Sequence, residues 1–169
     1  MISVNLQKAI NSQINAELWS AYLYLSMSMD AETKGLHGVA NWFYIQWLEE
    51  QDHARIFQKY LHSQDVPVIL QPIAAVPTGW DSHLQLFLDA LDHEKEVTAM
   101  IGTLAEEAYR EKDFATLGCL RWFVDEQVEE EQSVRDILDT LRLIGDDSYG
   151  LYQIDSQLGK RTYKKHDTL

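Results

Sequence analysis

The chain has 169 residues, with 14 lysines and arginines against 27 aspartates and glutamates, which gives a formal net charge of −13. So acidic a chain is not expected to bind nucleic acid, because contacts with the phosphate backbone depend on basic patches, whereas it suits cations as partners. An apolar share of 46% is too high for a disordered chain, and no stretch reaches the ~20 apolar residues of a membrane span.

Cysteine content and the first residues bear on the compartment. The single cysteine, Cys119, excludes an intrachain disulfide and a zinc site built on cysteines. Residues 1–5 lack the basic and apolar regions of a secretory signal peptide. We therefore expect a cytoplasmic protein with no membrane partner, folded as one domain over residues 1–169.

Three prolines, Pro67, Pro72 and Pro77, lie in one stretch between two long proline-free segments. Proline breaks a helix interior, so each of these segments can hold a pair of long helices. Glycines near residues 35–38 and polar residues near 111–113 mark the turn within each pair. The predicted helices span residues 4–34, 37–63, 82–110, 113–144 and 148–158, and a basic tail at 159–169 is expected to be frayed.

Apolar residues recur at three- and four-residue steps in each long segment, which is the period of a helix with one face in a core. In the second helix, for example, Val39, Phe43, Phe57 and Leu61 share a stripe. Short turns join the helices of each pair, whereas the proline-containing stretch is long enough to cross a bundle. The fold class is therefore all-α, a four-helix bundle with one long crossover and a short fifth helix at the C-terminus.

Several aromatic residues lie off these stripes or at their edges, among them Trp42, Tyr44 and Trp47. One bundle has too few interior positions to bury all of them. We therefore expect further burial between the subunits of a homo-oligomer.

Each stripe also carries ionisable or amide residues near its middle, where apolar residues would be expected. In chain order these are Glu17; Glu50 with His53; Glu94; and Gln127 with Glu130. A carboxylate removed from water costs several kcal/mol unless it is paired, and the stripes contain no lysine or arginine. The pattern therefore predicts bound cations.

The spacing brings the carboxylates to one level of the bundle. Residues equally far from the turn lie side by side in an antiparallel hairpin, as Glu17 and Glu50 do in the first pair and Glu94 and Glu130 in the second. Ligands three residues apart, as in Glu50-x-x-His53, share a helix face. Four carboxylates and one imidazole are enough for about two ions of iron, manganese or zinc.

With these residues the chain resembles the ferritins, and specifically the prokaryotic non-haem ferritins, over nearly its whole length. The matching positions are Glu17, Glu49-Glu50-x-x-His53, Glu94 and Glu126-Gln127-Val128-Glu129-Glu130. The resemblance implies iron storage and detoxification: a ferroxidase oxidises Fe(II) to Fe(III) with O2 or H2O2 at an intrasubunit diiron centre, and ferric mineral is stored in a cage of 24 subunits.

The resemblance assigns five ligands to the two irons of the ferroxidase centre. Glu17, Glu50 and His53 hold the first iron, and Glu50 bridges to the second. Glu94 and Glu130 complete the second iron.

Further residues beside the centre receive roles by the same resemblance. Gln127 lies close to the second iron. Tyr24 resembles a tyrosine that supplies an electron during oxygen reduction, although a core tyrosine with a bonded hydroxyl is the alternative. A third iron site, adjacent to the centre, is implied for Glu49, Glu126 and Glu129 together with Glu130.

Departures from related families narrow the prediction. Bacterioferritins carry Glu-x-x-His in both halves and a methionine haem ligand after the second-helix glutamate, whereas this chain has Gln127-x-x-Glu130 and Gln51, so we expect no haem. Two other functions stay open: a diiron or dimanganese oxidoreductase acting on peroxide or an organic substrate, and a metal-free acidic bundle acting as an interaction module.

Overall fold

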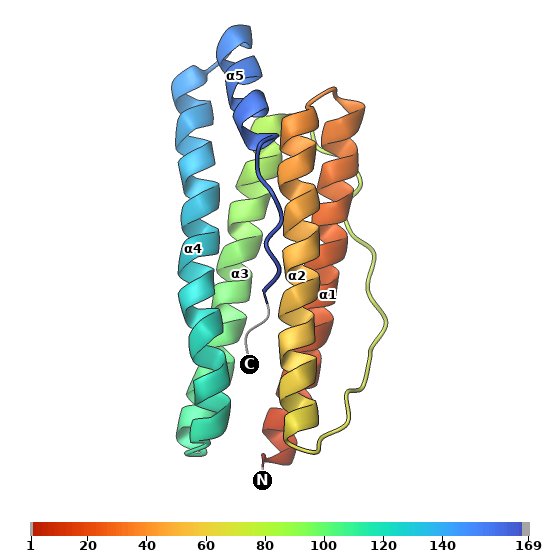
Figure 1. Cartoon of the computed structure of the whole chain (residues 1–169), viewed down its shortest axis with the longest axis vertical. Coiled ribbons are helices and arrows are strands. Elements are labelled where there is room, and N and C mark those ends of the chain that lie inside the picture. The colour runs from red at the N-terminus through yellow and green to blue at the C-terminus, as the bar shows by residue number, and fades with distance from the viewer. Residues whose placement is uncertain (1, 167–169) are drawn as a thin grey trace.

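The computed structural model describes residues 2–166 and contains five helices (Figure 1). They are α1 (Val4–Thr33), α2 (His37–Ser63), α3 (His83–Arg110), α4 (Phe114–Ile144) and α5 (Ser148–Leu158). The predicted fold class, four long helices followed by a short fifth one, is confirmed.

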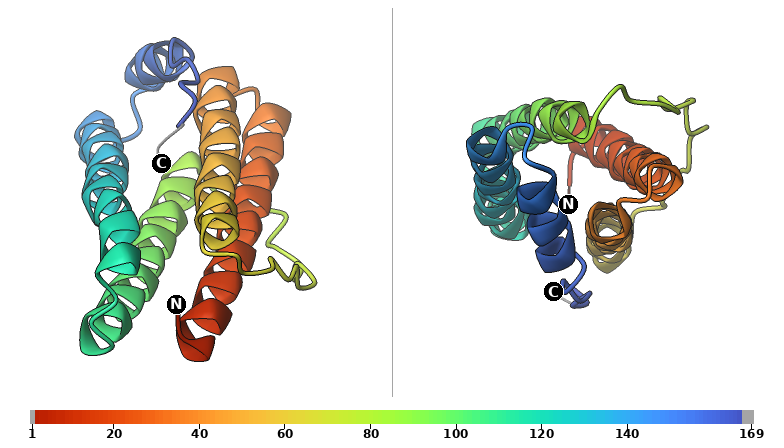
Figure 2. Two further views of the ribbon diagram at one scale, coloured as in Figure 1. Left: turned by 60° about the horizontal axis from the view of Figure 1, so that its bottom comes forward. Right: turned by 90° about the horizontal axis from the view of Figure 1, so that it is seen from above.

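The long helices form two antiparallel hairpins, α1 with α2 and α3 with α4, and α5 lies across the end of the bundle near the α1–α2 turn (Figures 1 and 2). Polar side chains begin most of the helices. Ser3, Ser82, Asp113 and Asp147 each accept a hydrogen bond from a backbone amide of the first turn, as expected for N-caps.

The crossover between α2 and α3 runs the length of the bundle along the outside of α1 (Figure 1). Side chains of α1 hold it at successive levels: Asn11 accepts a hydrogen bond of 2.6 Å from the Ile69 amide, and Ser26 donates one of 2.6 Å to the Pro77 carbonyl. The backbone of this proline-rich segment thus obtains partners that a helix or sheet would otherwise supply.

Two apolar clusters form the core, and a polar layer separates them. On α1, Ile14 belongs to one cluster and Leu23 to the other. On α4 the corresponding boundary lies between Phe123 and Val134. Every long helix therefore passes from one apolar cluster to the other through the same level. The buried polar residues of that level include Glu17, Ser20, Gln46, Glu49, Glu50, His53, His93, Glu94, Gln127 and Glu130.

One expectation about the aromatic residues was wrong. Trp42, placed off the core by its sequence position, is only 4% exposed within a single chain. Its ring packs edge-on against Phe43 and Phe87, with centroids 5.1 and 5.4 Å away. Arg161 from the C-terminal tail covers it, with the guanidinium carbon 4.8 Å from the ring centroid. The apolar periodicity of α2 did not predict this burial, because Arg161, which covers the Trp42 ring, comes from a segment after α5.

None of the helices in residues 2–166 is long and apolar enough to cross a membrane.

The contact between α2 and α5 depends on Gly38. A Cβ atom built on Gly38 would lie 1.6 Å from the backbone carbonyl oxygen of Asp155, so Gly38→Ala should force the helices apart and cost about 1–3 kcal/mol, the range for overpacking. Gly102→Ala is the matched control, because a Cβ atom there meets nothing within 4 Å. Thermal denaturation should show a lower Tm for Gly38→Ala only, and equal Tm values for the two variants would contradict this packing.

Candidate metal centre

The first half of the centre comes from α1 and α2. Glu17, Glu50 and His53 are at most 2% exposed, and one ligand atom from each lies within 4.8 Å of the others. His53 Nδ1 is 3.3 Å from Glu50 Oε2, as expected for side chains three residues apart on one helix. Gln13, one turn before Glu17, donates a hydrogen bond of 2.9 Å to Glu17 Oε1 and fixes that carboxylate.

The second half comes from α3 and α4, and it is held by hydrogen bonds. Gln127 Nε2 donates to Glu94 Oε2 at 3.0 Å, and the Tyr24 hydroxyl donates to Glu94 Oε1. Gln46 of α2 donates to Glu130 Oε2 at 2.8 Å. Amide and phenol donors therefore orient both carboxylates of this half.

Burial governs the electrostatics of the centre. It is the main cause that raises the pKa of Glu17 from 4.5 to about 8, with Glu50 as the next cause. Burial likewise raises the pKa of Glu94 to about 8, and the neighbouring Glu130 adds to the shift. The pKa of Glu50 lies well above 4.5 because of burial first and then Glu94 and Glu130. A divalent cation would relieve this repulsion, since opposite charge favours the carboxylate form.

Several buried polar atoms of the first half have no hydrogen-bond partner: Glu17 Oε2, Glu50 Oε2 and His53 Nε2. Buried polar atoms are almost always satisfied in folded proteins, and exceptions call for an explanation such as an ion. Carboxylate and imidazole atoms are ligands for iron, manganese and zinc, so the residues present fit a divalent metal.

An outer pocket of about 410 Å³ opens beside this centre. The carboxylates assigned by resemblance to a third iron all line it, but in different settings: Glu49 is buried, Glu126 half-buried and Glu129 exposed. Burial raises the pKa of Glu49 and of Glu126 to about 7. The full lining is Glu49, Trp122, Glu126, Glu129, Glu130, Ser133, Arg161, Lys165 and His166.

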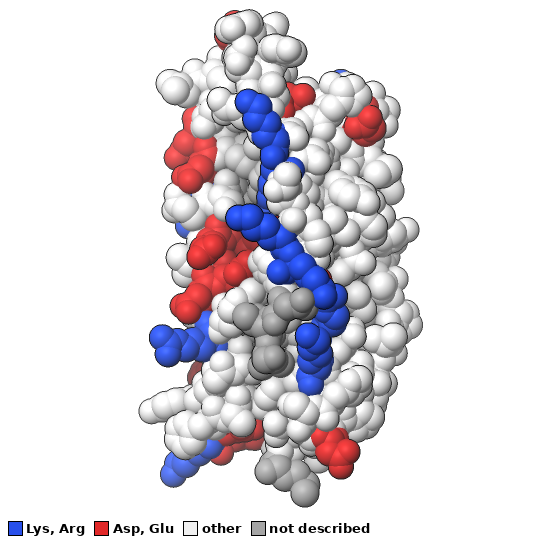
Figure 3. All heavy atoms as spheres, viewed as in Figure 1, with Lys and Arg blue, Asp and Glu red and all other residues white. Residues whose placement is uncertain are grey.

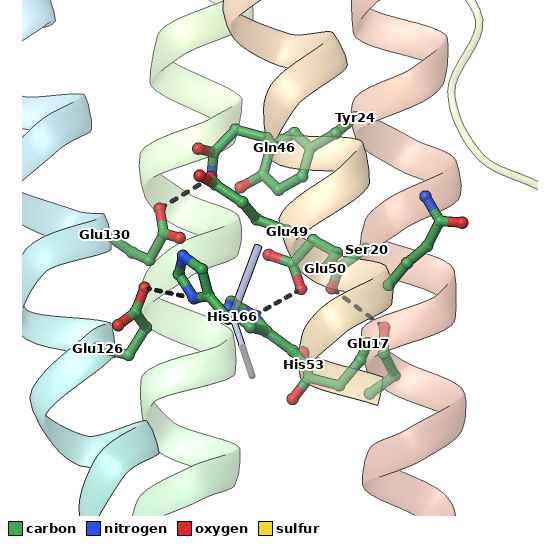
Figure 4. A network of polar contacts seen from close by, with 12 residues as sticks. Glu17, Ser20, Tyr24, Gln46, Glu49, Glu50, His53, Glu126, Glu130 and His166 are labelled. Atoms are coloured by element: carbon green, nitrogen blue, oxygen red, sulfur yellow. Dashed lines mark hydrogen bonds and ion pairs between the residues drawn. The ribbon is translucent and has the colours of Figure 1, made fainter. Parts of the chain in front are cut away.

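The C-terminal tail also differs from expectation. Fraying was expected for residues 159–169, but residues 160–166 lie along the bundle, with Arg161 Nη2 2.5 Å from Glu49 Oε2. Residues 167–169 lie outside the described part of the chain. The imidazole of His166 lies between the two hairpins, close to Glu126 and His53 (Figure 4). Sequence reasoning missed both residues because nothing in their spacing relates the tail to the stripes.

Two further buried contacts went unpredicted. Gln46 lies on the α2 stripe, and its position one turn before Glu50 was the available signal. His93 is 8% exposed. Its Nε2 is 2.8 Å from Ser20 Oγ, and its ring lies edge-on to Tyr24 with centroids 5.8 Å apart. Burial lowers the pKa of His93 to about 4, so it lies beside the centre as a neutral group at pH 7.

The chain is similar to known proteins over nearly its whole length. The ferritin-like domain family matches residues 7–144. A bacterial non-heme ferritin of Bacteroides fragilis (strain 638R) is 44% identical over 161 residues, covering 95% of this chain and all of that protein. One from Staphylococcus aureus (strain USA300) is 37% identical over 163 residues, covering 96% of this chain and 98% of that one.

Solved structures agree as well. An open pore ferritin from the hyperthermophilic archaeon Archaeoglobus fulgidus superposes with a TM-score of 0.95 at 44% identity, covering 96% of this chain and all of that one. The chain therefore belongs to the ferritin family. Within that family it is of the non-haem type, and its function is iron storage with ferroxidase activity.

The raised pKa values predict how the stability of the metal-free protein depends on pH. Above about pH 4.5, Glu17 and Glu94 lose their protons in the unfolded chain but keep them in the folded protein until about pH 8. The free energy of unfolding therefore falls as the pH rises from about 4.5 to about 8. His93, with its lowered pKa, acts in the opposite direction only below pH 6.5. The Tm should therefore fall between pH 6.5 and 8.

Calorimetry of metal-free protein checks this, with Glu17→Gln expected to flatten the decline. The exposed Glu106 provides the control variant Glu106→Gln, which should keep the wild-type slope. A Tm that rises across this interval in the wild-type protein would contradict the electrostatic account.

Proposed function

We propose that this chain oxidises Fe(II) between its two hairpins, with Glu17, Glu50, His53, Glu94 and Glu130 as iron ligands, and stores the ferric product in a cage of 24 subunits. The observation that carries the proposal is the polar layer between two apolar clusters, to which all four long helices contribute buried carboxylates. In this layer Glu50 pairs with His53, and Arg161 of the tail pairs with Glu49. Such a layer is costly unless cations neutralise it.

The proposed chemistry follows from the ligands. Two Fe(II) ions held between the hairpins each give up one electron, and two electrons with two protons reduce O2 to H2O2, or H2O2 to two molecules of water. Hard carboxylate oxygens bind Fe(III) better than Fe(II), so the site favours oxidation. Glu50 lies between Glu17 and the second-half carboxylates Glu94 and Glu130, which influence its pKa, and this place suits the bridging role.

Gln127 and Tyr24 both act on Glu94 in this scheme. Each donates a hydrogen bond to a different oxygen of that carboxylate, so Glu94 is oriented from two sides. An amide at Gln127 adds no negative charge to the second iron, which weakens the hold on the product and helps it leave. The short path from the Tyr24 hydroxyl to Glu94 supports an electron-supplying role for this tyrosine.

The outer pocket is the proposed third iron site. Glu49, Glu126, Glu129 and Glu130 line it together, and Glu130 also belongs to the inner centre. Iron there would lie on the path between the inner centre and the protein surface.

Storage requires assembly, and the single chain leaves apolar surface for it. Tyr109, Phe114, Leu143, Tyr149 and Tyr152 are all at least 67% exposed. Exposed apolar side chains in such number favour burial against other subunits. Members of this family form oligomeric cages that bind iron, and we propose the 24-subunit form for this chain.

Replacing the bridging carboxylate tests the centre. Glu50→Ala should slow Fe(II) oxidation by at least about 10–100-fold, the loss seen when partners of a metal site are removed. Stopped-flow absorbance of ferric product after mixing with Fe(II) in air measures the rate, and Glu106→Ala, an exposed carboxylate, is the control. An unchanged rate in Glu50→Ala, with the cage intact by size exclusion, would overturn the assignment.

Iron capacity separates storage from the alternatives. After repeated aerobic Fe(II) additions, the size-exclusion peak of a very large particle should carry far more iron per chain than the carboxylates of one centre can bind. About two irons per chain in a small oligomer would instead indicate a diiron oxidoreductase, and an iron-free peak would indicate an interaction module.

A further inference from the structure

The last residues that the structure describes lie across the outer pocket and are tied to α2. The Tyr163 hydroxyl donates a hydrogen bond of 2.6 Å to Asp52 Oδ2, and the His166 amide donates one of 2.8 Å to the same oxygen. Arg55 donates to the His166 carbonyl at 3.3 Å. Asp52 is only 3% exposed. The backbone amide of His166 is thus bonded to Asp52 and its carbonyl to Arg55. Arg55 itself pairs with Asp52 at 2.8 Å.

This path carries the tail along the face where Figure 3 shows a line of lysine and arginine side chains beside an acidic patch. The basic tail therefore lies next to acidic surface, and Figure 4 shows His166 reaching inward from it toward Glu126. Opposite charges of this kind favour the docked tail.

The imidazole of His166 is placed as a ligand would be. Its Nδ1 is 3.5 Å from Glu126 Oε1 and is buried without a hydrogen bond. The indole of Trp122 meets the ring edge-on at 5.5 Å between centroids, and the ring of His53 lies 5.7 Å away. Trp122 also packs against His53 at 5.4 Å, so one aromatic side chain holds both imidazoles.

Three ligand atoms, one each from His53, Glu126 and His166, lie within 4.8 Å of one another. Ligands ~2 Å from a tetrahedral ion lie roughly 3.3 Å apart, so small side-chain rotations bring this group to a metal-binding geometry. His53 is 2% exposed, and its Nε2 atom has no hydrogen-bond partner. Buried nitrogen atoms without partners on both histidines indicate that a ligand belongs between them.

Arg161 changes the character of the outer pocket. Its guanidinium donates to Glu49 Oε2 at 2.5 Å and to the Trp42 carbonyl at 3.3 Å. Glu49, one of the four outer carboxylates, therefore already has a fixed partner. The ligand atoms beside the tail, from His53, Glu126 and His166, are a mixed set of imidazole nitrogen and carboxylate oxygen. Such a set suits divalent ions of intermediate softness, Zn²⁺ and Co²⁺ included, better than Fe(III).

We propose that His166, Glu126 and His53 form a second divalent-cation site, in which the C-terminal tail supplies one ligand and the bound ion locks the tail over the outer pocket. The proposal rests on the proposed function only in that it refines the ligand set of the outer site.

Sharing His53 makes the two sites compete. A neutral imidazole has one nitrogen with a free lone pair, and His53 presents Nδ1 to Glu50 on the inner side. An ion bound by His53 at the tail site therefore leaves the inner iron without its only imidazole ligand. Zn²⁺ at the tail site should slow Fe(II) oxidation, and loss of His166 should relieve that part of the inhibition.

Metal-free, full-length protein titrated with Co²⁺ tests the site, because imidazole and carboxylate ligation gives characteristic visible absorption. The titration is carried out in a Glu17→Gln background to weaken the inner centre. His166→Ala should lose about one Co²⁺ per chain or weaken the tightest phase by at least tenfold. His62→Ala, an exposed histidine at the end of α2, should match its parent.

Anomalous diffraction at the zinc edge from Zn²⁺-soaked crystals gives a second readout that does not depend on affinity. A peak between His166 and Glu126 is expected in the wild-type protein and its absence in His166→Ala. Equal Co²⁺ binding in His166→Ala and its parent, or no wild-type peak at that position, would overturn the proposal. These outcomes are independent of the Glu50→Ala oxidation rate, which tests the ferroxidase assignment alone.

Discussion

The cost of burying carboxylates shapes this protein more than any other interaction. Glu17, Glu50 and Glu94 are at most 2% exposed, and burial is the largest cause of the raised pKa of each. Without a cation, the layer keeps Glu17 and Glu94 protonated up to about pH 8, because burial disfavours their charged form. A bound divalent cation would favour the charged form of these carboxylates, which is why a buried layer of this kind suits a protein that collects iron.

The rest of the structure holds that layer in place. Apolar clusters on both sides exclude water and fix the level at which the four helices present their polar residues. Hydrogen bonds from Gln13, Gln46, Gln127 and Tyr24 orient carboxylates that would otherwise repel one another. The crossover that joins the two hairpins is held along α1 by hydrogen bonds with Asn11 and Ser26. The tail then covers the outer pocket with Arg161 and His166.

Much of this was predictable because helices follow local rules. The confinement of proline to one stretch and the three- and four-residue spacing of apolar residues predicted the all-α bundle, which the structure confirms. The polar interruptions of each stripe pointed to Glu17, Glu50, His53, Glu94 and Glu130, and all five are buried at one level. Prediction failed for Trp42, Arg161 and His166, since each depends on the course of a tail that has no periodic pattern. Contacts with side chains of α2, among them Asp52 and Glu49, hold that tail.

The sequence by itself determined the helices, their antiparallel pairing and the level at which carboxylates would gather. These features follow from the 3.6-residue period and from the number of residues between each carboxylate and the turn, both of which are local properties of the sequence. Only the tertiary structure decided which donors orient each carboxylate, that Trp42 is covered within one chain, and that a histidine 113 positions after His53 faces the same space. Contacts between segments so far apart are set by the shape and packing of the whole bundle, and no local pattern encodes them.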